Sequence, residues 1–225
     1  MDSELVKDLP AKPTADTGID AFTHALEAFV SIYASDFTDG LCLQAIKIIF
    51  ENLPVVVKEP SNIEARQKMH NAATLAGMAF SNVSVGINHA LAHSLGAKFH
   101  IPHGRANAVF LLSTINFNSG VPVKFVPFTN YKKYVAPEKY LLVAKALGCN
   151  GNDEKELING LKEKIKELLK KSELPIRVSE LGIKLDEYLS SIPDLVNKAS
   201  NDLSLRINPR MPLVSELEEL FRNAY

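Results

Sequence analysis

The spacing of apolar residues is the feature that most constrains how this chain can fold. In DAFTHALEAFVSIY, residues 20–33, apolar side chains recur at steps of three and four, and LCLQAIKIIFENL, residues 41–53, repeats the pattern. Such steps place side chains on one face of an α-helix, whereas a half-buried strand needs strict alternation. Helical spacing dominates after residue 14, with no internal repeat and no convincing β-sheet. The sequence therefore predicts an all-α fold.

Prolines and glycines mark where these helices are expected to end. Pro54 and Pro60 are expected to close the segment 41–53, and Gly148 is a plausible residue just past a helix end. Residues 119–137 carry three prolines, which predicts a long connection across the surface rather than a sheet. Further helices are expected at residues 63–82, 88–99, 104–118, 137–148, 153–171, 185–203 and 214–225.

Charge and composition narrow the class of protein. The formal net charge of −1 gives no general attraction to nucleic acid or anionic lipid. We see no window of about eighteen apolar residues, so we expect no membrane span. Cys42 and Cys149 stand apart and form no CxxC motif, which favours a reducing, cytoplasmic location.

Histidine is concentrated in GINHALAHSLGAKFHIPHG, residues 86–104. Four of the six histidines lie in this stretch: His89, His93, His100 and His103. His89 and His93 are four residues apart, a spacing that places two side chains on one face of a helix. Asp20 and His24, in DAFTH, have the same spacing upstream. One carboxylate and three imidazoles around a divalent ion would leave a position open for water or a substrate oxygen.

The spacing alone does not select the ligands, because four histidines compete for two remaining places. His103 lies between Pro102 and Gly104, in a turn that would fix its direction, whereas His100 is expected to face elsewhere. A buried Asp–His pair or an exposed helix face would produce the DAFTH spacing as often as a metal site, and the His89–His93 spacing alone is little more specific. From the residues alone, a metal site and ordinary helix packing are therefore comparable interpretations.

Longer stretches resemble a known family. TADTGIDAFTHALEAFVS (14–31) and GINHALAHSLGAKFHIPHGRAN (86–107) are similar to the two signature regions of the iron-containing alcohol dehydrogenases. ARQKMHNAATLAGMAFSN (65–82) and NPRMPLVSELEELFRNAY (208–225) most resemble the alcohol dehydrogenase part of bifunctional aldehyde-alcohol dehydrogenases, and propanol dehydrogenases. The likeness is weak only over residues 119–200. It implies the helical metal-binding domain of the dehydroquinate synthase-like fold.

The resemblance also implies roles for individual residues. His93 matches the histidine that the family places near the nicotinamide, as a proton relay or an orienting group. Phe80, in GMAF, resembles an apolar wall of the substrate pocket, although core packing explains it equally well. His100 and His70 are assigned no chemical role. The metal ligands carried over by motif are Asp20, His24, His89 and His103.

The implied reaction is hydride transfer between a primary alcohol or aldehyde and a nicotinamide cofactor, NAD or NADP. Fe(II), or alternatively Zn(II), would act as the Lewis acid. Residues 1–14 resemble the end of an interdomain connection, and residues 15–225 the helical catalytic domain. The resemblance implies that the residues that bind the cofactor lie mainly in an N-terminal α/β nucleotide-binding domain that this chain is expected to lack. In agreement, the eleven glycines form no GxGxxG or GGGS-like element.

Two other functions compete with this one. A non-catalytic helical assembly module would use the apolar surface that an isolated domain exposes, and a homo-oligomer is expected in either case. A metal-dependent hydrolase could use the same ligands to activate water, but no substrate-anchoring motif supports it. The expected partner of the leading hypothesis is a small alcohol or aldehyde, with no nucleic acid and no membrane.

Overall fold

The computed structural model describes residues 2–122 and 133–225, and within these ranges it contains helices and no strand. The all-α prediction is confirmed there, while the expected connection at 119–137 falls largely outside the described residues. The α-helices are α1 (Ala11–Val30), α2 (Asp36–Lys58), α3 (Ile63–Val83), α4 (Ile87–Phe99), α5 (His103–Ser119), α6 (Ala136–Ala146), α7 (Glu154–Lys171), α8 (Leu185–Ser200) and α9 (Val214–Asn223). Three short 3-10 helices are η1 (Ser3–Val6), η2 (Val178–Leu181) and η3 (Leu203–Ile207).

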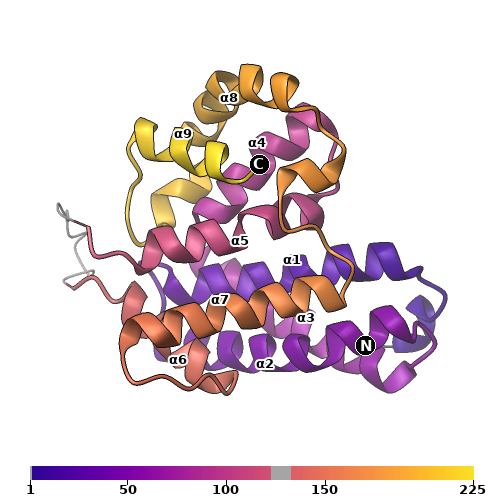
Figure 1. Cartoon of the computed structure of the whole chain (residues 1–225). Helices are drawn as coiled ribbons and strands as arrows, with labels where there is room; N and C mark the ends of the chain where they lie inside the picture. Colours follow the sequence, from indigo (N-terminus) through magenta and orange to yellow (C-terminus); the bar gives the residue numbers. More distant parts are fainter. Residues whose placement is uncertain (1, 123–132) are drawn as a thin grey trace.

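Two groups of helices lie on either side of α5 (Figure 1), and each encloses a hydrophobic core. The first is formed by α1, α2, α3, α6 and α7, and α5 contributes Leu111 and Ile115 to it. The second is formed by α4, α8 and α9, and α5 contributes Val109 and Phe110 to it. Helix α5 is therefore packed on both sides, and its first turn meets α1 and α4 where the two cores join.

Side-chain caps begin several helices where the sequence supplies them. Ser35 and Thr38 form a reciprocal capping box at the start of α2, and Asn62 accepts a hydrogen bond from the Ala65 amide at the start of α3. The Asp153 side chain accepts a hydrogen bond from the Glu156 amide at the start of α7. These contacts satisfy amide groups that have no partner within the helix. Gly148 follows α6 with φ of +74°, as predicted.

The expected end of the second helix at Pro54 is wrong. Helix α2 continues through Pro54 to Lys58. A proline inside a helix costs about 3 kcal/mol because it removes one hydrogen bond and crowds the preceding turn. Val56 and Val57 lie beyond it and are buried in the first core, and each buried valine stabilises the fold by about 1.5–3 kcal/mol. Their burial offsets the proline.

The expectation that the sequence has no long apolar window is also wrong, because α2 contains one. By length and composition alone it could cross a membrane, with a mean hydropathy of 1.6 over its most apolar stretch. In this fold it packs against α1 and α3 and buries Cys42, Ile46 and Ile49 completely. The core helix of a globular domain has the same length and composition.

The first residues are tied to the helical body through Arg66. Its guanidinium is almost fully buried and donates to the carbonyl oxygens of Leu9, at 2.7 Å, and Pro60, at 2.5 Å. Helix α1 already begins at Ala11, inside the stretch interpreted as a connection. The division between residues 14 and 15 stays a prediction.

Candidate metal centre

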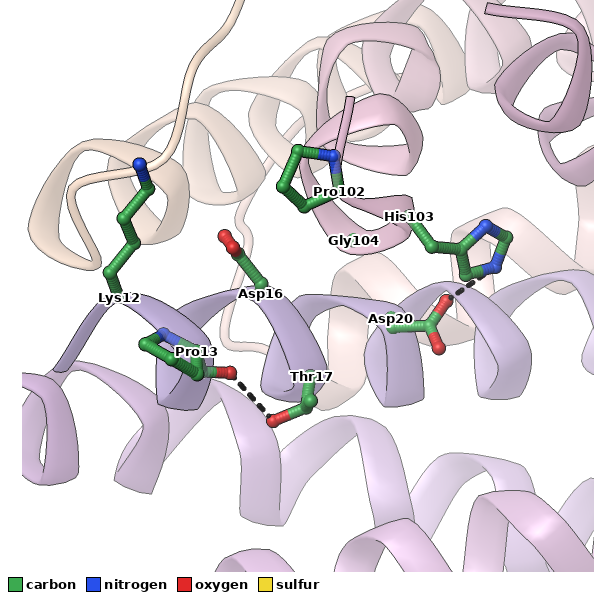
Figure 2. Close-up of a pocket in the computed structure, with 8 residues that line it drawn as sticks. All are labelled: Lys12, Pro13, Asp16, Thr17, Asp20, Pro102, His103 and Gly104. Atoms are coloured by element: carbon green, nitrogen blue, oxygen red, sulfur yellow. Dashed lines mark hydrogen bonds and ion pairs between the residues drawn. The ribbon is translucent and has the colours of Figure 1, made fainter. Parts of the chain in front are cut away.

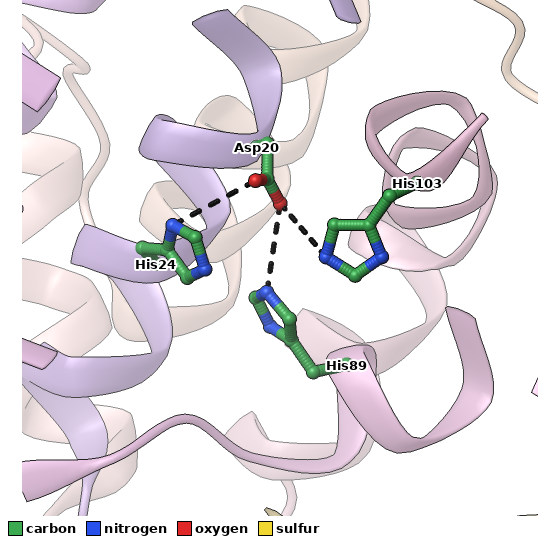
Figure 3. A group of neighbouring side chains, drawn as sticks. All are labelled: Asp20, His24, His89 and His103. Atoms are coloured by element: carbon green, nitrogen blue, oxygen red, sulfur yellow. Dashed lines mark ion pairs between the residues drawn. The ribbon is translucent and has the colours of Figure 1, made fainter. Parts of the chain in front are cut away.

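Helix α1 carries Asp20 and His24 one turn apart, on the side that faces α4 and α5 (Figure 3). The opposite side of the same helix is fixed in the first core, where Ile19 and Phe22 are fully buried. Both polar side chains remain partly exposed, with about a fifth of each accessible to solvent. The burial of the apolar side of α1 thus fixes the helix so that both polar residues face α4 and α5.

Helices α4 and α5 bring His89 and His103 to the same point. His89 is in the first turn of α4 and is 2% exposed, whereas His103 is 41% exposed. The sequence interpretation placed His103 in a turn, but it is the first residue of α5, with Pro102 at the N-cap. A Cβ added at Gly104 would lie 1.8 Å from the backbone oxygen of Asp16. Only glycine allows α5 to approach α1 this closely.

The donor atoms of the four predicted ligands lie within 4.8 Å of one another. Oδ1 of Asp20 is 3.2 Å from Nε2 of His103 and 3.6 Å from Nε2 of His89. Its Oδ2 is 3.9 Å from Nδ1 of His24. A small divalent cation with bonds of about 2.1 Å holds tetrahedral ligands about 3.4 Å apart. The observed separations are close to that spacing.

Glu27 supports this cluster from behind, and the sequence analysis missed it. Its carboxylate is 5% exposed, and Oε2 accepts a hydrogen bond from Nδ1 of His89 at 2.5 Å. Oε1 accepts the backbone amide of Asn88 at 2.6 Å, at the start of α4. Asp20, His24 and Glu27 follow one another at steps of four and three, which places all three on one helix face. That spacing is the signal in the sequence from which Glu27 could have been predicted as a neighbour of the ligands.

Asn107 was also missed, and its side-chain nitrogen contacts three members of the cluster: Asp20, His103 and, at 3.4 Å, Nε2 of His89. Its side-chain amide is fully buried and donates to Oδ1 of Asp20 at 2.7 Å. The same nitrogen lies 3.2 Å from Nε2 of His103, one helical turn earlier on α5. Asn88 in turn donates to the Asn107 side-chain oxygen at 2.9 Å. This buried amide pair fixes α4 against α5 directly beneath the ligands.

Electrostatics set distinct protonation states in the cluster. Burial acts to raise the pKa of Asp20, but hydrogen bonds with His103 and His89 outweigh it and hold that pKa far below its usual range. Burial lowers the pKa of His24 to about 4, against the attraction of Asp20. Burial acts likewise on His89, but its hydrogen bonds to Asp20 and Glu27 raise its pKa to about 9. At neutral pH the His89 ring is therefore protonated on both nitrogens, and a bound cation would displace the proton on Nε2.

The structure places His93 beside the four ligands but outside their group. Its ring stacks on the ring of His103 with centroids 5.2 Å apart, and its Nδ1 is 2.7 Å from Oδ2 of Asp202. Phe80 stacks on His24, with centroids 4.2 Å apart and planes at 18°. It thus forms a wall of the cluster as well as packing against the first core.

The remaining two histidines lie elsewhere. His100 is exposed at the C-cap of α4 in the left-handed conformation, with φ of +54°. His70, on α3, borders a separate cavity of about 240 Å³ next to Arg66. Neither belongs to the group of converging ligand atoms.

A cavity of about 440 Å³ opens beside the cluster (Figure 2). Asp20 and His103 line one end of it, and Lys12 lies toward the other end. Asp16, in the middle, forms an ion pair with Arg105 at 3.0 Å. Phe80 is not among the residues that line this cavity.

Comparisons with known proteins show which family the chain resembles. Residues 14–225 match the model of the Fe-containing alcohol dehydrogenase family, C-terminal part. The chain is 41% identical to the aldehyde-alcohol dehydrogenase of Streptococcus pneumoniae, over 100% of the chain and 25% of that protein. It is 42% identical to the 1-propanol dehydrogenase of Salmonella typhimurium, over 98% of the chain and 57% of that protein.

Solved structures show the same fold. A crystal structure of 1,3-propanediol oxidoreductase superposes on the whole chain with a TM-score of 0.88 and 34% identity, and the match covers 55% of that protein. An alcohol dehydrogenase from Oenococcus oeni gives the same TM-score with 31% identity. The chain spans between a quarter and somewhat more than half of the length of these relatives.

Proposed function

Because the chain belongs to the iron-containing alcohol dehydrogenase family, we propose that it supplies the metal-binding half of an alcohol dehydrogenase active site. The reaction is hydride transfer between a small primary alcohol or its aldehyde and NAD or NADP. One observation carries the proposal: ligand atoms of Asp20, His24, His89 and His103, drawn from three helices, converge within 4.8 Å at the end of a cavity. The 1-propanol substrate named for one relative supports a small primary alcohol.

The donor set fits a divalent transition-metal ion. One carboxylate and three imidazoles suit Fe(II), with Zn(II) as the alternative, and leave a coordination position for substrate oxygen. When bound, the ion would supply the Lewis acidity that makes the alcohol proton easier to remove. The ionised Asp20 and the neutral His24 are already in the states that bind a cation.

The chain's own residues prepare the site. Glu27 accepts the Nδ1 proton of His89 and so leaves Nε2 directed at Asp20. Such carboxylate–histidine contacts fix the ring and raise its basicity toward a metal. Asn107 holds Asp20 in position through its amide. The nucleotide would be bound mainly by the portion of the relatives that this chain does not span, and a homo-oligomer is part of the same proposal.

Reconstitution with Co(II) tests the metal site and the substrate together. The full chain, purified without oxygen, should bind about one Co(II) with the visible bands of a four- or five-coordinate ion, and 1-propanol should shift those bands. His89→Ala and Asp20→Ala should abolish the bands, while His93→Ala and the exposed His100→Ala should keep them.

Two results would contradict this proposal. If His93→Ala lost the ion and His103→Ala kept it, the ligand assignment would be wrong. If the folded chain bound no ion but sedimented as a defined oligomer, the assembly-module alternative would replace it. Activity in the absence of a nucleotide-binding partner is not expected, so the spectrum rather than turnover is the readout.

A further inference from the structure

We propose that Asp202 is a positioning residue for His93, which it holds with the ring proton on Nδ1 and the Nε2 lone pair free beside the metal centre. This inference rests on the proposed function for its chemical purpose, since a free Nε2 is what a proton relay next to the substrate needs. The contact itself is visible in the fold and can be tested without a metal.

The geometry of the pair is specific. Oδ2 of Asp202 lies 2.7 Å from Nδ1 of His93, and the two residues are 109 positions apart in the chain. The Asp202 side chain is 18% exposed, against 45% for His93. An ionised carboxylate can only accept a hydrogen bond, so the proton of the pair must be on Nδ1. Across the described residues the structure gives Nε2 of His93 no hydrogen-bond partner.

Asp202 is itself fixed by the backbone. It is the N-cap of η3, and its Oδ1 accepts the amide of Ser204 at 2.8 Å. Burial acts to raise the pKa of Asp202, but hydrogen bonds from His93 and Ser204 outweigh it and lower that pKa. Its two carboxylate oxygens therefore have separate tasks: one caps η3 and the other orients His93.

The position of His93 connects this pair to the metal centre. His93 lies one turn after His89 on α4, and its ring stacks on that of His103 with planes at 18°. The carboxylate fixes one edge of the ring and the stacking fixes its plane. With both fixed, Nε2 points to the opposite side from Asp202. The other tautomer would present an N–H donor there instead of an acceptor, and an inverted ring would place a carbon there.

Asparagine at position 202 separates orientation from folding. Asparagine caps helices as well as aspartate does, so its Oδ1 can keep the Ser204 contact. The side-chain NH2 then faces Nδ1 of His93, and a donor at that position requires Nδ1 to be the acceptor. Asp202→Asn should therefore move the His93 ring proton to Nε2 while η3 stays capped. Asp202→Ser keeps a cap but cannot reach His93, and both tautomers should be populated.

Nitrogen-15 NMR of the histidine rings in the full chain, at a pH where His93 is neutral, reads the tautomer directly. In the unsubstituted chain His93 should have a protonated Nδ1 and an unprotonated Nε2. The two nitrogens should exchange their characteristic shifts in Asp202→Asn. The control Asp194→Asn removes an exposed carboxylate that pairs with Lys198, and it should leave the His93 spectrum unchanged.

Either of two outcomes would overturn the inference. An Nε2-protonated His93 in the unsubstituted chain would show that Asp202 does not set the tautomer. An unchanged Nδ1-protonated ring in a folded Asp202→Asn would assign the orientation to the His103 stacking alone. Failure of metal binding would contradict the proposed function but would leave this tautomer result intact, so the two can be told apart.

Discussion

Replacing Gly104 with alanine tests whether the close approach of α5 to α1 builds the metal centre. An added Cβ would lie 1.8 Å from the backbone oxygen of Asp16 and 2.5 Å from its carbonyl carbon. Ordinary contact for a Cβ begins at 3.4 Å. The obstructing atoms are backbone and cannot rotate away, so the two helices must separate by about 1.5 Å.

That separation sets the size of the effect. Overpacking a well-filled site usually costs about 1–3 kcal/mol, and a clash with rigid backbone belongs at the upper end. We expect Gly104→Ala to lower the free energy of unfolding by about 3 kcal/mol or more. His103 precedes Gly104 and lies 3.2 Å from Asp20, so a shift of α5 also pulls one ligand away. Zn(II) affinity should fall at least about tenfold, as for misplaced ligands elsewhere.

Guanidinium unfolding of the metal-free chain measures the first effect, and Zn(II) titration against a competing chelator measures the second. Gly40→Ala is the matched control, because Gly40 is also helical and an added Cβ there meets nothing within 4 Å. It should raise stability by about 0.5–1 kcal/mol and leave Zn(II) affinity unchanged. A Gly104→Ala chain with unaltered stability and unaltered affinity would refute this reasoning.

Three further predictions concern other contacts. Glu27→Gln should lower Zn(II) affinity about 10–100-fold, while exposed Glu64→Gln should not; equal affinities would exclude Glu27 as a support of the site. Burial raises the pKa of the Cys42 thiol to about 12, so its stabilising contribution is present below about pH 8.5 and lost as pH rises toward 12. The free energy of unfolding, measured at a series of pH values above about 8.5, should therefore decline less steeply with pH in Cys42→Ala than in the unsubstituted chain. An identical slope in the two proteins would contradict the raised pKa of Cys42. Tyr188 donates to the Phe221 carbonyl oxygen at 2.7 Å, so Tyr188→Phe should cost about 1–2 kcal/mol; unchanged stability would contradict that.

Much of the fold could be predicted because apolar periodicity reports directly which face of a helix is buried. The helix at residues 153–171 was predicted nearly to its ends, since its polar and apolar faces are strongly separated. The continuation of α2 through Pro54 could not be predicted, because the local cost of a proline was offset by valines that only the tertiary fold buries. A local rule fails where distant packing supplies the larger energy.

The candidate site shows the same division. The four predicted ligands lie in short motifs, and the structure brings their donor atoms together. Asp202 carries no local pattern that points to the ligands, because its contact with His93 depends on how η3 packs against α4. Asn107 lies four residues after His103, but its contact with Asp20 depends on how α5 packs against α1. Glu27 had a visible spacing on α1, but a buried glutamate becomes recognisable as a histidine partner only when α4 is in place.

Metal content tests the central claim most directly. The chain would be purified without oxygen, equilibrated with Fe(II) or Zn(II), freed of excess ion and measured by elemental analysis, alongside His103→Ala and the exposed control His100→Ala. We predict about one ion per chain for the unsubstituted protein and for His100→Ala, and none retained by His103→Ala. No bound ion in a folded unsubstituted chain, or equal occupancy in all three proteins, would contradict the assignment of this centre.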